Sequence, residues 1–490
     1  MVNTTYKADI GLEVHVELAT RSKMFCSCAV VDTTTAPPNS SVCEICCGMP
    51  GTLPVINRSA VELAMQAALA LNCSVVETSI FARKNYFYPD LPKGYQISQY
   101  EYPLAVNGFI LINTPEGEKT IRVRRAHLEE DTGKLTHVNK KGDNFSLVDL
   151  NRAGVPLLEI VTEPDMHSVE DVRAYSRSLR SLLRWIGVTS GDMEKGTMRF
   201  EANLSMRPEG SEELGTRVEI KNLNSFKAME QAILYQMDIQ RAKLDKGEKV
   251  KQQTLGWSDS QGKTVAQRSK EDANDYRYFP EPDLPPLVIK NSWVDEVRTS
   301  MPELPDGRRL RYRSANGLIS EDIERLVEDK PVSDYFEACL AAAPNLAPKR
   351  IANWLLTDLF AWLNLNGQSF EEMEMSPESF VRLIAVVDDS IINQNTGKEV
   401  LAEMLAAGQT ADAIIEKRGL KQVSDGNLIT AMVAKALKEN SGEVRSYLDG
   451  KDTVSNWLFG QVMRAAQGKA NPQVVKEELN RQLENLKKIS

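Results

Sequence analysis

Three segments of the chain alternate strictly between hydrophobic and polar residues. In residues 9–18 every even position is apolar, and Glu13 and His15 stand among the polar odd positions. Residues 198–205 and 217–221 repeat this alternation. A period of two predicts half-buried strands. Their second faces are charged, which favours an antiparallel sheet with one face on the core and one face open to a ligand. For any one strand, a solvated outer face is the alternative.

Helical patterns dominate after about residue 290. The Pro-rich segment 280–286 cannot continue a helix and predicts a domain boundary just after it. A weaker boundary is expected near Gly408 or Gly419. The last helix is predicted to begin at Asn471 and Pro472, a capping residue followed by a residue that suits the first helical position. Its apolar face consists of Val475, Leu479, Leu483 and Leu486.

An earlier helix is predicted from Ser168, with Asp171 as its capping partner. It carries a stripe of basic residues that is either a solvated face or a phosphate contact; these are Arg173, Arg177, Arg180 and Arg184.

Composition narrows the class of protein. The 490 residues include 59 Lys and Arg against 68 Asp and Glu, a formal charge of −9. The composition, 42% hydrophobic and 26% charged residues, excludes a disordered or fibrous chain. The net negative charge argues against a generic nucleic-acid coat. We expect no signal peptide and no membrane span, because the N-terminus lacks an apolar core and no run of 18 apolar residues occurs. Seven cysteines, an odd number, favour a reducing compartment, by default the cytoplasm.

Cysteines form two close pairs near the N-terminus. Cys26 and Cys28 are followed, after 14 residues, by Cys43 and Cys46. Two such pairs can close a tetrahedral four-thiolate zinc site, which would be structural because no position stays open for water. Cys47 is an alternative to Cys46 as a ligand, and a group of ordinary reduced thiols is the alternative to a site.

Carboxylates and histidines predict hard-cation chemistry. Glu13 and His15 share a strand face, residues 127–131 are rich in acids, and Glu159 interrupts an apolar run where a lone carboxylate is costly. Carboxylates, water and phosphate are the ligands that Mg²⁺ prefers. For each residue taken singly, a surface acid or a satisfied core histidine is the better explanation.

Common nucleotide and hydrolase motifs are missing. Residues 256–264 resemble a P-loop but have five residues between the glycines instead of four, so we reject that interpretation. There is no G-x-S-x-G nucleophile elbow and no self-contained amidase site. If ATP binds, it binds on the sheet with metal ions.

Seven long sequence blocks are too specific to arise by chance. They are IGLEVHVEL (10–18), RKNYFYPDLPKGYQISQ (83–99), HLEEDTGK (127–134), VDLNRAGVPLLEIVTEPD (148–165), EIKNLNSF (219–226), DYRYFPEPDLPP (275–286) and GQVMRAAQGKANPQ (460–473). Over essentially the whole chain, these blocks resemble a known family, the GatB subunit of the bacterial and organellar aspartyl/glutamyl-tRNA amidotransferase. The chain departs from the common pattern at Glu44 and Cys47.

The resemblance implies an α+β fold: an N-terminal antiparallel-sheet, kinase-like "cradle" domain, then an all-α helical domain and a small helical tail domain. The expected boundaries are 1–294 for the catalytic cradle, 295–408 for the helical domain and 409–490 for the tRNA-binding tail.

The resemblance also implies a reaction. ATP phosphorylates the side-chain carboxylate of Glu mischarged on tRNA(Gln), or of Asp on tRNA(Asn), and ammonia displaces the phosphate to give the amide. The enzyme is thus an ATP-dependent carbon–nitrogen ligase with glutamine as the amido donor. Ammonia comes from an amidase (glutaminase) subunit, and a small third subunit completes a heterotrimer.

The family's site residues carry over to matching positions. The resemblance implies one Mg²⁺ at His15, Glu130 and Glu159, and a second, more transient one at Glu13, Glu129 and Glu219. It implies structural Zn²⁺ at Cys26, Cys28, Cys43 and Cys46. Lys84, Arg199 and Lys221 are expected to be catalytic. Tyr86, Lys93, Gln99 and Arg277 are expected to bind the cofactor, and the first three, with Lys84, to hold nucleotide or the aminoacyl end. From their placement on strands, the candidates for neutralising charge at the phosphates are Arg199, Arg152, Arg277 and Lys221.

Two alternatives share parts of this pattern. The related archaeal tRNA(Gln)-specific subunit carries an insertion domain between cradle and tail, for which the run after Pro286 leaves no room. A zinc-bearing tRNA chaperone with a dead site would tolerate loss of Glu13, Glu129 and Glu219, yet all three are present.

Overall fold

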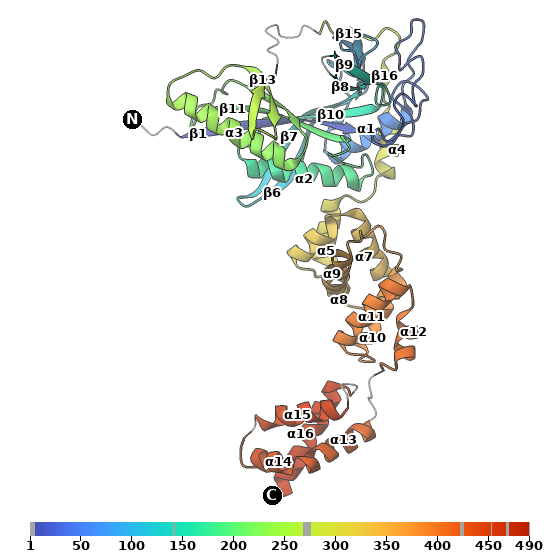
Figure 1. Ribbon diagram of the computed structural model, residues 1–490, viewed down its shortest axis with the longest axis vertical. Coiled ribbons are helices and arrows are strands. Elements are labelled where there is room, and N and C mark those ends of the chain that lie inside the picture. The colour runs from blue at the N-terminus through green and yellow to red at the C-terminus, as the bar shows by residue number, and fades with distance from the viewer. Residues whose placement is uncertain are drawn as a thin grey trace. The chain divides into compact units, whose positions relative to one another are not determined.

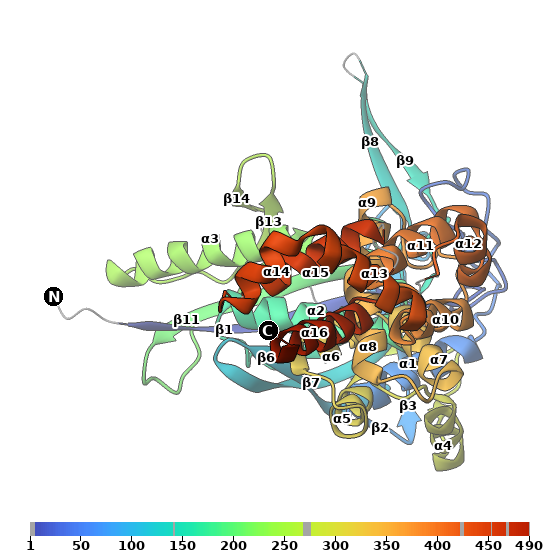
Figure 2. The same ribbon diagram turned by 90° about the horizontal axis from the view of Figure 1, so that it is seen from below.

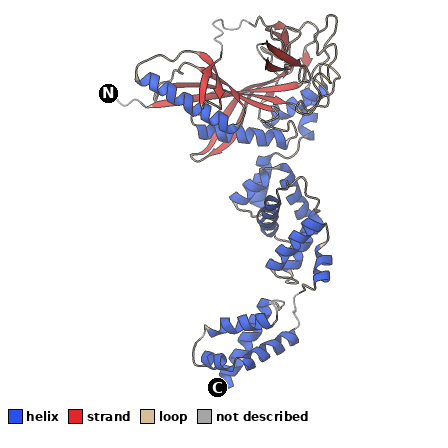
Figure 3. Cartoon of the chain, in the orientation of Figure 1, coloured by secondary structure: helices blue, strands red, loops and turns tan. Residues whose placement is uncertain are grey.

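The structure, a computed structural model, describes residues 5–140, 143–267, 276–421, 426–451, 453–466 and 470–489. Parts of two signature blocks, at Asp275 and at residues 467–469, lie outside the described residues. The chain divides into two compact units, Met1–Pro305 and Asp306–Ser490. Strands occupy the first unit and helices make up the second, so the predicted α+β class is confirmed (Figure 3). The division into three domains at 294 and 408 stays a prediction.

The first unit is built on a twelve-stranded sheet. Its principal order is β14-β13-β12-β11-β1-β10-β7-β5-β4-β15, with β6 on β7 and β2 on β6. The pairs are antiparallel except β12 with β13. The strands are β1 (Tyr6–Glu17), β2 (Ser74–Val75), β4 (Phe81–Asn85), β5 (Tyr95–Gln99), β6 (Ala105–Thr114), β7 (Gly117–Glu130), β10 (Pro156–Thr162), β11 (Met198–Pro208), β12 (Val218–Leu223), β13 (Gln253–Ser258), β14 (Lys263–Ala266) and β15 (Phe279–Pro280).

The three predicted alternating strands are confirmed as β1, β11 and β12. Their apolar residues face helices, and Leu12, Val14 and Val16 are buried. Helix α1 (Arg58–Ala70) packs on β6 and β7, α2 (Val169–Trp185) on β6, and α3 (Phe226–Asp245) on β11 and β12 (Figure 1). The polar face of the sheet is therefore the one left for a ligand.

Local sequence explains how α2 begins. The Ser168 hydroxyl accepts from the Asp171 amide at 3.1 Å, and the Asp171 carboxylate accepts from the His167 amide at 2.9 Å. Asp171 is therefore the capping partner of Ser168, as predicted, although its carboxylate binds the amide of the residue before the cap and not that of Ser168 itself. The basic stripe is partly engaged inside the unit, because Arg173 forms two hydrogen bonds to Glu230 of α3.

Smaller elements complete the first unit. They are β3 (Thr78–Ser79) paired with β16 (Leu287–Val288), α4 (Asn291–Ser300), and the hairpin β8 (Lys134–Lys140) with β9 (Asp143–Asp149). The hairpin projects from the rest of the unit (Figure 2). The segment that resembles a P-loop forms the β13–β14 hairpin, consistent with its rejection.

The second unit is helical. Its elements are α5 (Pro305–Ala315), α6 (Ser320–Val327), α7 (Lys330–Ala342), α8 (Pro348–Asn353), the π-helical η1 (Trp354–Leu359), α9 (Phe360–Asn366), α10 (Pro377–Asp388), α11 (Gln394–Ala407), α12 (Ala411–Arg418), α13 (Gly426–Glu439), α14 (Ser441–Leu448), α15 (Val454–Ala465) and α16 (Pro472–Ile489). No helix among the described residues is long and apolar enough to cross a membrane.

Helices α13 to α16 share a hydrophobic core of their own. The last helix begins as predicted, with the Asn471 side chain accepting from the Gln473 amide at 2.9 Å. Leu479 and Leu483 of α16 are buried in this core, whereas Leu486 is 36% exposed. The four helices thus supply their own apolar interior.

Candidate active site

Four neighbouring strands, β11, β1, β10 and β7, bring the conspicuous polar residues together. Within the sheet His15 is opposite Glu159 on one side and Arg199 on the other, and Glu159 is opposite His127. Directly opposed residues of antiparallel strands present their side chains on the same face. The site is therefore assembled from segments almost 200 residues apart in the sequence.

The first carboxylate cluster consists of His15, Glu129 and Glu159. His15 Nε2 lies 3.5 Å from Glu129 Oε1 and 3.3 Å from Glu159 Oε2. Burial acts to lower the pKa of His15, but the hydrogen bond and charge of Glu159 and the charge of Glu129 raise it to about 9. Glu129 is buried, and Glu159 is 7% exposed. Both carboxylates are almost completely removed from water. Their negative charges are therefore stable only beside a cation, either the His15 imidazolium or a metal ion.

The second carboxylate cluster consists of Glu13, Glu201 and Glu219, which lie on β1, β11 and β12. Burial and then the charges of Glu159 and Glu201 raise the pKa of Glu13. Lys221 Nζ lies 2.7 Å from Glu201 and 3.2 Å from Glu219, and so offsets part of this charge. A divalent cation would offset the remainder.

Both clusters fit Mg²⁺. In each, one ligand atom per residue lies within 4.8 Å of the others. An octahedral Mg²⁺ with bonds of about 2.1 Å separates adjacent ligands by about 3 Å, so small side-chain movements suffice. Each cluster offers three protein ligands and leaves positions for water and phosphate oxygens.

In the first cluster, Glu129 takes the position that the sequence predicts for its neighbour Glu130. Glu129, and not Glu130, lies with His15 and Glu159. Glu130 forms an ion pair with Lys93 and accepts a hydrogen bond from the Ile97 amide at 2.9 Å. The reason is that successive residues of a strand point to opposite faces.

The second predicted group changes as well. Glu13 and Glu219 lie together, but their third partner is Glu201 instead of Glu129. Glu201 stands at a polar position of the alternating segment 198–205, from which the sequence analysis selects no metal ligand. The signal that could have found it is the pairing of β1 with β11, which sets Glu13 opposite Glu201.

Lys84 and a group of tyrosines lie over the first carboxylate cluster. The Lys84 ammonium is 5.1 Å from the Tyr276 ring centre, and the Tyr86 ring meets the same ring edge-on at 6.0 Å. Burial opposes the charge on Lys84, but Glu129 and then Glu159 raise its pKa. Lys84 is therefore a cation held beside the carboxylates, and its catalytic role stays a prediction.

The other residues predicted to bind nucleotide have different surroundings. The Gln99 side-chain carbonyl accepts from the amides of Leu104 and Leu128 at 3.1 and 2.9 Å, so it braces the backbone. Lys93 is engaged by Glu130. Arg277 is exposed and has a positive φ of 45°. The side chains of Gln99 and Lys93 are thus engaged by other groups of the protein, and nucleotide binding by these residues stays a prediction.

Two of the predicted phosphate-binding arginines already have anionic partners. Arg199 Nη2 lies 2.8 Å from Asp131, and Arg152 Nε lies 3.4 Å from the same carboxylate. Arg152 also donates to the carbonyls of Thr132 and Gly133 at 3.0 and 2.7 Å. Asp131 thus balances both guanidinium groups.

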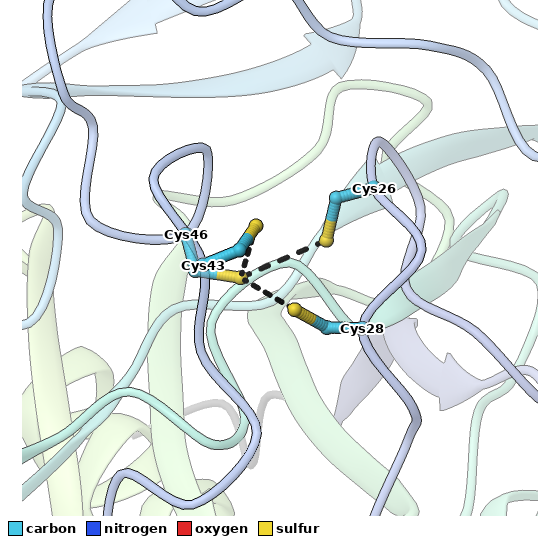
Figure 4. Close-up of side chains that lie close together, drawn as sticks. All are labelled: Cys26, Cys28, Cys43 and Cys46. Atoms are coloured by element: carbon cyan, nitrogen blue, oxygen red, sulfur yellow. Dashed lines mark hydrogen bonds between the residues drawn. The ribbon is translucent and has the colours of Figure 1, made fainter.

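The four predicted cysteines lie together (Figure 4). The Cys46 sulfur is 3.7 Å from Cys26, 3.8 Å from Cys43 and 3.9 Å from Cys28. A tetrahedral zinc ion with Zn–S bonds of about 2.3 Å spaces its sulfurs by about 3.8 Å, so this cluster fits zinc. Cys47, the alternative ligand, is not in the group.

Lys23 supports the cysteine cluster and was missed by the sequence analysis. Although it is a lysine, it is fully buried. Its ammonium lies 2.8 Å from the Ser41 carbonyl, 3.1 Å from that of Leu150 and 3.4 Å from the Cys46 sulfur. Hydrogen bonding from Cys26 lowers the pKa of Cys46 to about 4, with the charge of Lys23 adding to the effect. The local sequence Ser-Lys-Met gives no sign of this burial.

Comparison with known families gives the class of the sheet unit. The GatB/GatE catalytic domain matches residues 8–295, and the GatB domain matches residues 334–483. The first unit is therefore a catalytic domain of the GatB/GatE class.

Full-length relatives show to which family within the GatB/GatE class the chain belongs. The GatB subunit of the aspartyl/glutamyl-tRNA(Asn/Gln) amidotransferase from Roseiflexus sp. (strain RS-1) is 47% identical over 482 residues, 98% of each chain. Proteins of the same name from Thermodesulfovibrio yellowstonii and Persephonella marina are 45% and 47% identical, over 96% of this chain and 98% of theirs. The chain belongs to the GatB family.

Proposed function

We propose that this chain activates and amidates the side-chain carboxylate of Glu mischarged on tRNA(Gln), of Asp mischarged on tRNA(Asn), or of both. The observation that carries this proposal is the pair of carboxylate clusters that fit Mg²⁺ on one open sheet face of a GatB-family chain. The products would be Gln-tRNA(Gln) and Asn-tRNA(Asn).

The chemistry needs activation before amidation. A carboxylate is a poor electrophile, because attack would add a second charge to it. One carboxylate oxygen therefore attacks the terminal phosphorus of ATP, and ADP leaves with the electrons of the broken P–O bond. Ammonia then attacks the acyl carbon, and phosphate leaves with the former carboxylate oxygen. Phosphoryl transfer depends mainly on positioning and charge neutralisation, so no nucleophilic side chain is required.

The residues divide this work. His15, Glu129 and Glu159 would hold one Mg²⁺, and Glu13, Glu201 and Glu219 a second. These ions would neutralise phosphate oxygens and orient the transferring group. Lys84 would face the same reactants. Lys221 holds Glu201 and Glu219 in place through its two ion pairs.

Zinc in the cysteine cluster would be structural, since four thiolates leave no position for water. It would fix the loop through residues 26–46. Lys23 would tie this loop to the segment before β10 through the Leu150 carbonyl.

The proposal extends to partners and place. An amidase (glutaminase) subunit would supply ammonia, a small third subunit would complete a heterotrimer, and the helical segments 295–408 and 409–490 would contact tRNA. None of the seven cysteines forms a disulfide, which suits a reducing compartment such as the cytoplasm of bacteria.

The test separates amidation from ammonia production. The chain is purified with its two partner subunits and given ATP, Mg²⁺ and Glu-tRNA(Gln), with an ammonium salt replacing glutamine. We expect ADP and Gln-tRNA(Gln). Absence of both products would refute the proposal.

Two matched variants assign the site. Glu159→Gln removes a carboxylate of the first cluster and should abolish ammonia-driven amidation, while the partner's glutaminase activity at least partly survives. Asp165→Asn removes a nearby carboxylate that pairs with Arg122 at 2.6 Å and should leave amidation near the wild-type level. Full amidation by the Glu159 variant would refute the metal set.

A further inference from the structure

Arg125 has an unfilled guanidinium group beside the first carboxylate cluster. It lies on β7, two positions before His127. Its Nη2 is 3.9 Å from Glu159 Oε1, beyond hydrogen-bond length. Its Nε is buried and has no hydrogen-bond partner. Among the described residues, its side chain makes no hydrogen bond.

Other arginines of the same sheet have their guanidinium groups filled. Arg122, on the same strand, donates from Nε and Nη2 to Asp165 at 2.8 and 2.6 Å. Arg207 on β11 makes the same two-point contact with Asp9, at 2.7 and 3.1 Å. A guanidinium fork matches carboxylate or phosphate oxygens in this way. The Arg125 guanidinium has the same two donors, but among the described residues no carboxylate oxygen lies within hydrogen-bond distance of them.

Aromatic rings hold this fork in place. The Arg125 guanidinium lies 6.0 Å from the centre of the Tyr100 ring. Tyr100 in turn stacks on Tyr278, with 4.1 Å between ring centres and 6° between planes. The stack supports the guanidinium and takes none of its N–H groups. Buried hydrogen-bond donors are rarely left without an acceptor in native proteins. We therefore expect a bound ligand to supply the acceptor for the Arg125 guanidinium.

We propose that Arg125 binds an oxyanion of the reactants, either the terminal phosphate of ATP or the side-chain carboxylate of the aminoacyl-tRNA. This rests on the proposed function, and it adds a residue that the sequence analysis did not select. Arg199 and Lys221 already form ion pairs with Asp131 and Glu201. A bound oxyanion therefore needs a further positive charge, which Arg125 supplies. Of the arginines beside this cluster, Arg125 is the one whose Nε is buried without a hydrogen-bond acceptor among the described residues.

The test compares Arg125→Ala and Arg125→Lys with Arg122→Ala in the assembled complex. Ammonia-driven amidation is measured as kcat/KM. We expect Arg125→Ala to lose about 100-fold or more, and Arg125→Lys, which keeps the charge without the fork, at least about tenfold. Arg122→Ala should stay within about twofold of wild type. Added guanidinium ion at millimolar concentration should partly restore Arg125→Ala, which loss of a purely structural contact would not allow.

Two measurements distinguish the terminal phosphate of ATP from the side-chain carboxylate as the ligand of Arg125. If Arg125→Ala weakens binding of a non-hydrolysable ATP analogue but not of ADP, the ligand is the terminal phosphate. If nucleotide binding is unchanged and the KM for Glu-tRNA(Gln) rises, the ligand is the carboxylate. Either result supports the proposal. Activity and binding equal to those of Arg122→Ala overturn it.

The outcomes separate this inference from the proposed function. An active wild type with an active Arg125→Ala overturns the role of Arg125 alone. A wild type without amidation overturns both. If Arg125→Ala fails to assemble with its partners, Arg125→Lys and Arg125→Gln decide by the same criteria.

Discussion

Replacing Lys23 by Met should weaken the zinc binding that we propose for the cysteine cluster. Met has nearly the same length and shape as Lys but no charge, and Lys23 is fully buried. The change therefore removes the ammonium while keeping the packing. It also leaves the carbonyls of Ser41 and Leu150 without the donor that they now share.

The magnitude follows from the geometry. Two unit charges separated by the 3.4 Å between Lys23 Nζ and Cys46 Sγ attract by about 5 kcal/mol at an effective dielectric constant of about 20. The cost of burying the ammonium offsets part of this attraction. We expect a net loss of about 3 kcal/mol, roughly 100-fold in zinc affinity.

The assay is zinc content by elemental analysis of the purified complex, followed by competition with a chelator of known affinity. Lys195→Met is the matched control, since Lys195 makes an exposed ion pair at 2.8 Å with Asp32 of the same cysteine loop. It should retain zinc as the wild type does. Lys23→Gln, which can still donate to the carbonyls but lacks charge, should fall between the two.

The reasoning fails if Lys23→Met holds zinc within about threefold of Lys195→Met. In that case the thiolates would be neutralised by other means, and the ammonium would serve only to join the two loop segments. A folded but zinc-free Lys23→Met complex, by contrast, agrees with the prediction.

Three further predictions concern other parts of the chain. Glu201→Gln should raise the Mg²⁺ concentration needed for half-maximal amidation at least about tenfold, and an unchanged Mg²⁺ titration would exclude Glu201 from the second cluster. Burial raises the pKa of Asp171, but hydrogen bonds from Lys119 and the backbone lower it below its usual 3.8. Stability from this carboxylate is thus present above about pH 4 and lost as the pH falls further; Asp171→Asn should flatten the acid limb of unfolding free energy against pH in urea titrations. Leu479→Ala should destabilise the α13–α16 core by about 3 kcal/mol, seen as earlier unfolding by Trp457 fluorescence with the sheet unit's transition unchanged.

The sequence predicted the fold class and most residues of the site, but it did not predict which of these residues contact one another. Strand alternation and family blocks located β1, β11 and β12, and they selected most of the carboxylates that the structure brings together. They could not decide between Glu129 and Glu130, because that choice depends on which of the two shares the sheet face of Glu159 on the neighbouring strand β10. The register with Glu159 and His127 settles it, and register is a tertiary property.

Ion pairing was the other part hidden from the sequence. Arg199 was expected to be available for phosphate, yet it faces Asp131. Arg125 was not selected, yet its buried Nε has no hydrogen-bond acceptor among the described residues. Which cation is paired depends on contacts between residues distant in the chain, such as those 68 positions apart in the Arg199–Asp131 bond.

The central place of β1 has a consequence for biosynthesis. This strand, made first, is hydrogen-bonded on one side to β10 and on the other to β11. Neither edge can be covered until the ribosome has added well over a hundred more residues, and covering both takes almost 200, which at about 5–20 residues per second is roughly 10–40 s. During that interval the nascent chain presents an unpaired apolar strand to the cell. Chaperone dependence of folding should therefore be greatest early in translation, and slowing elongation before residue 198 should lower the yield of soluble protein.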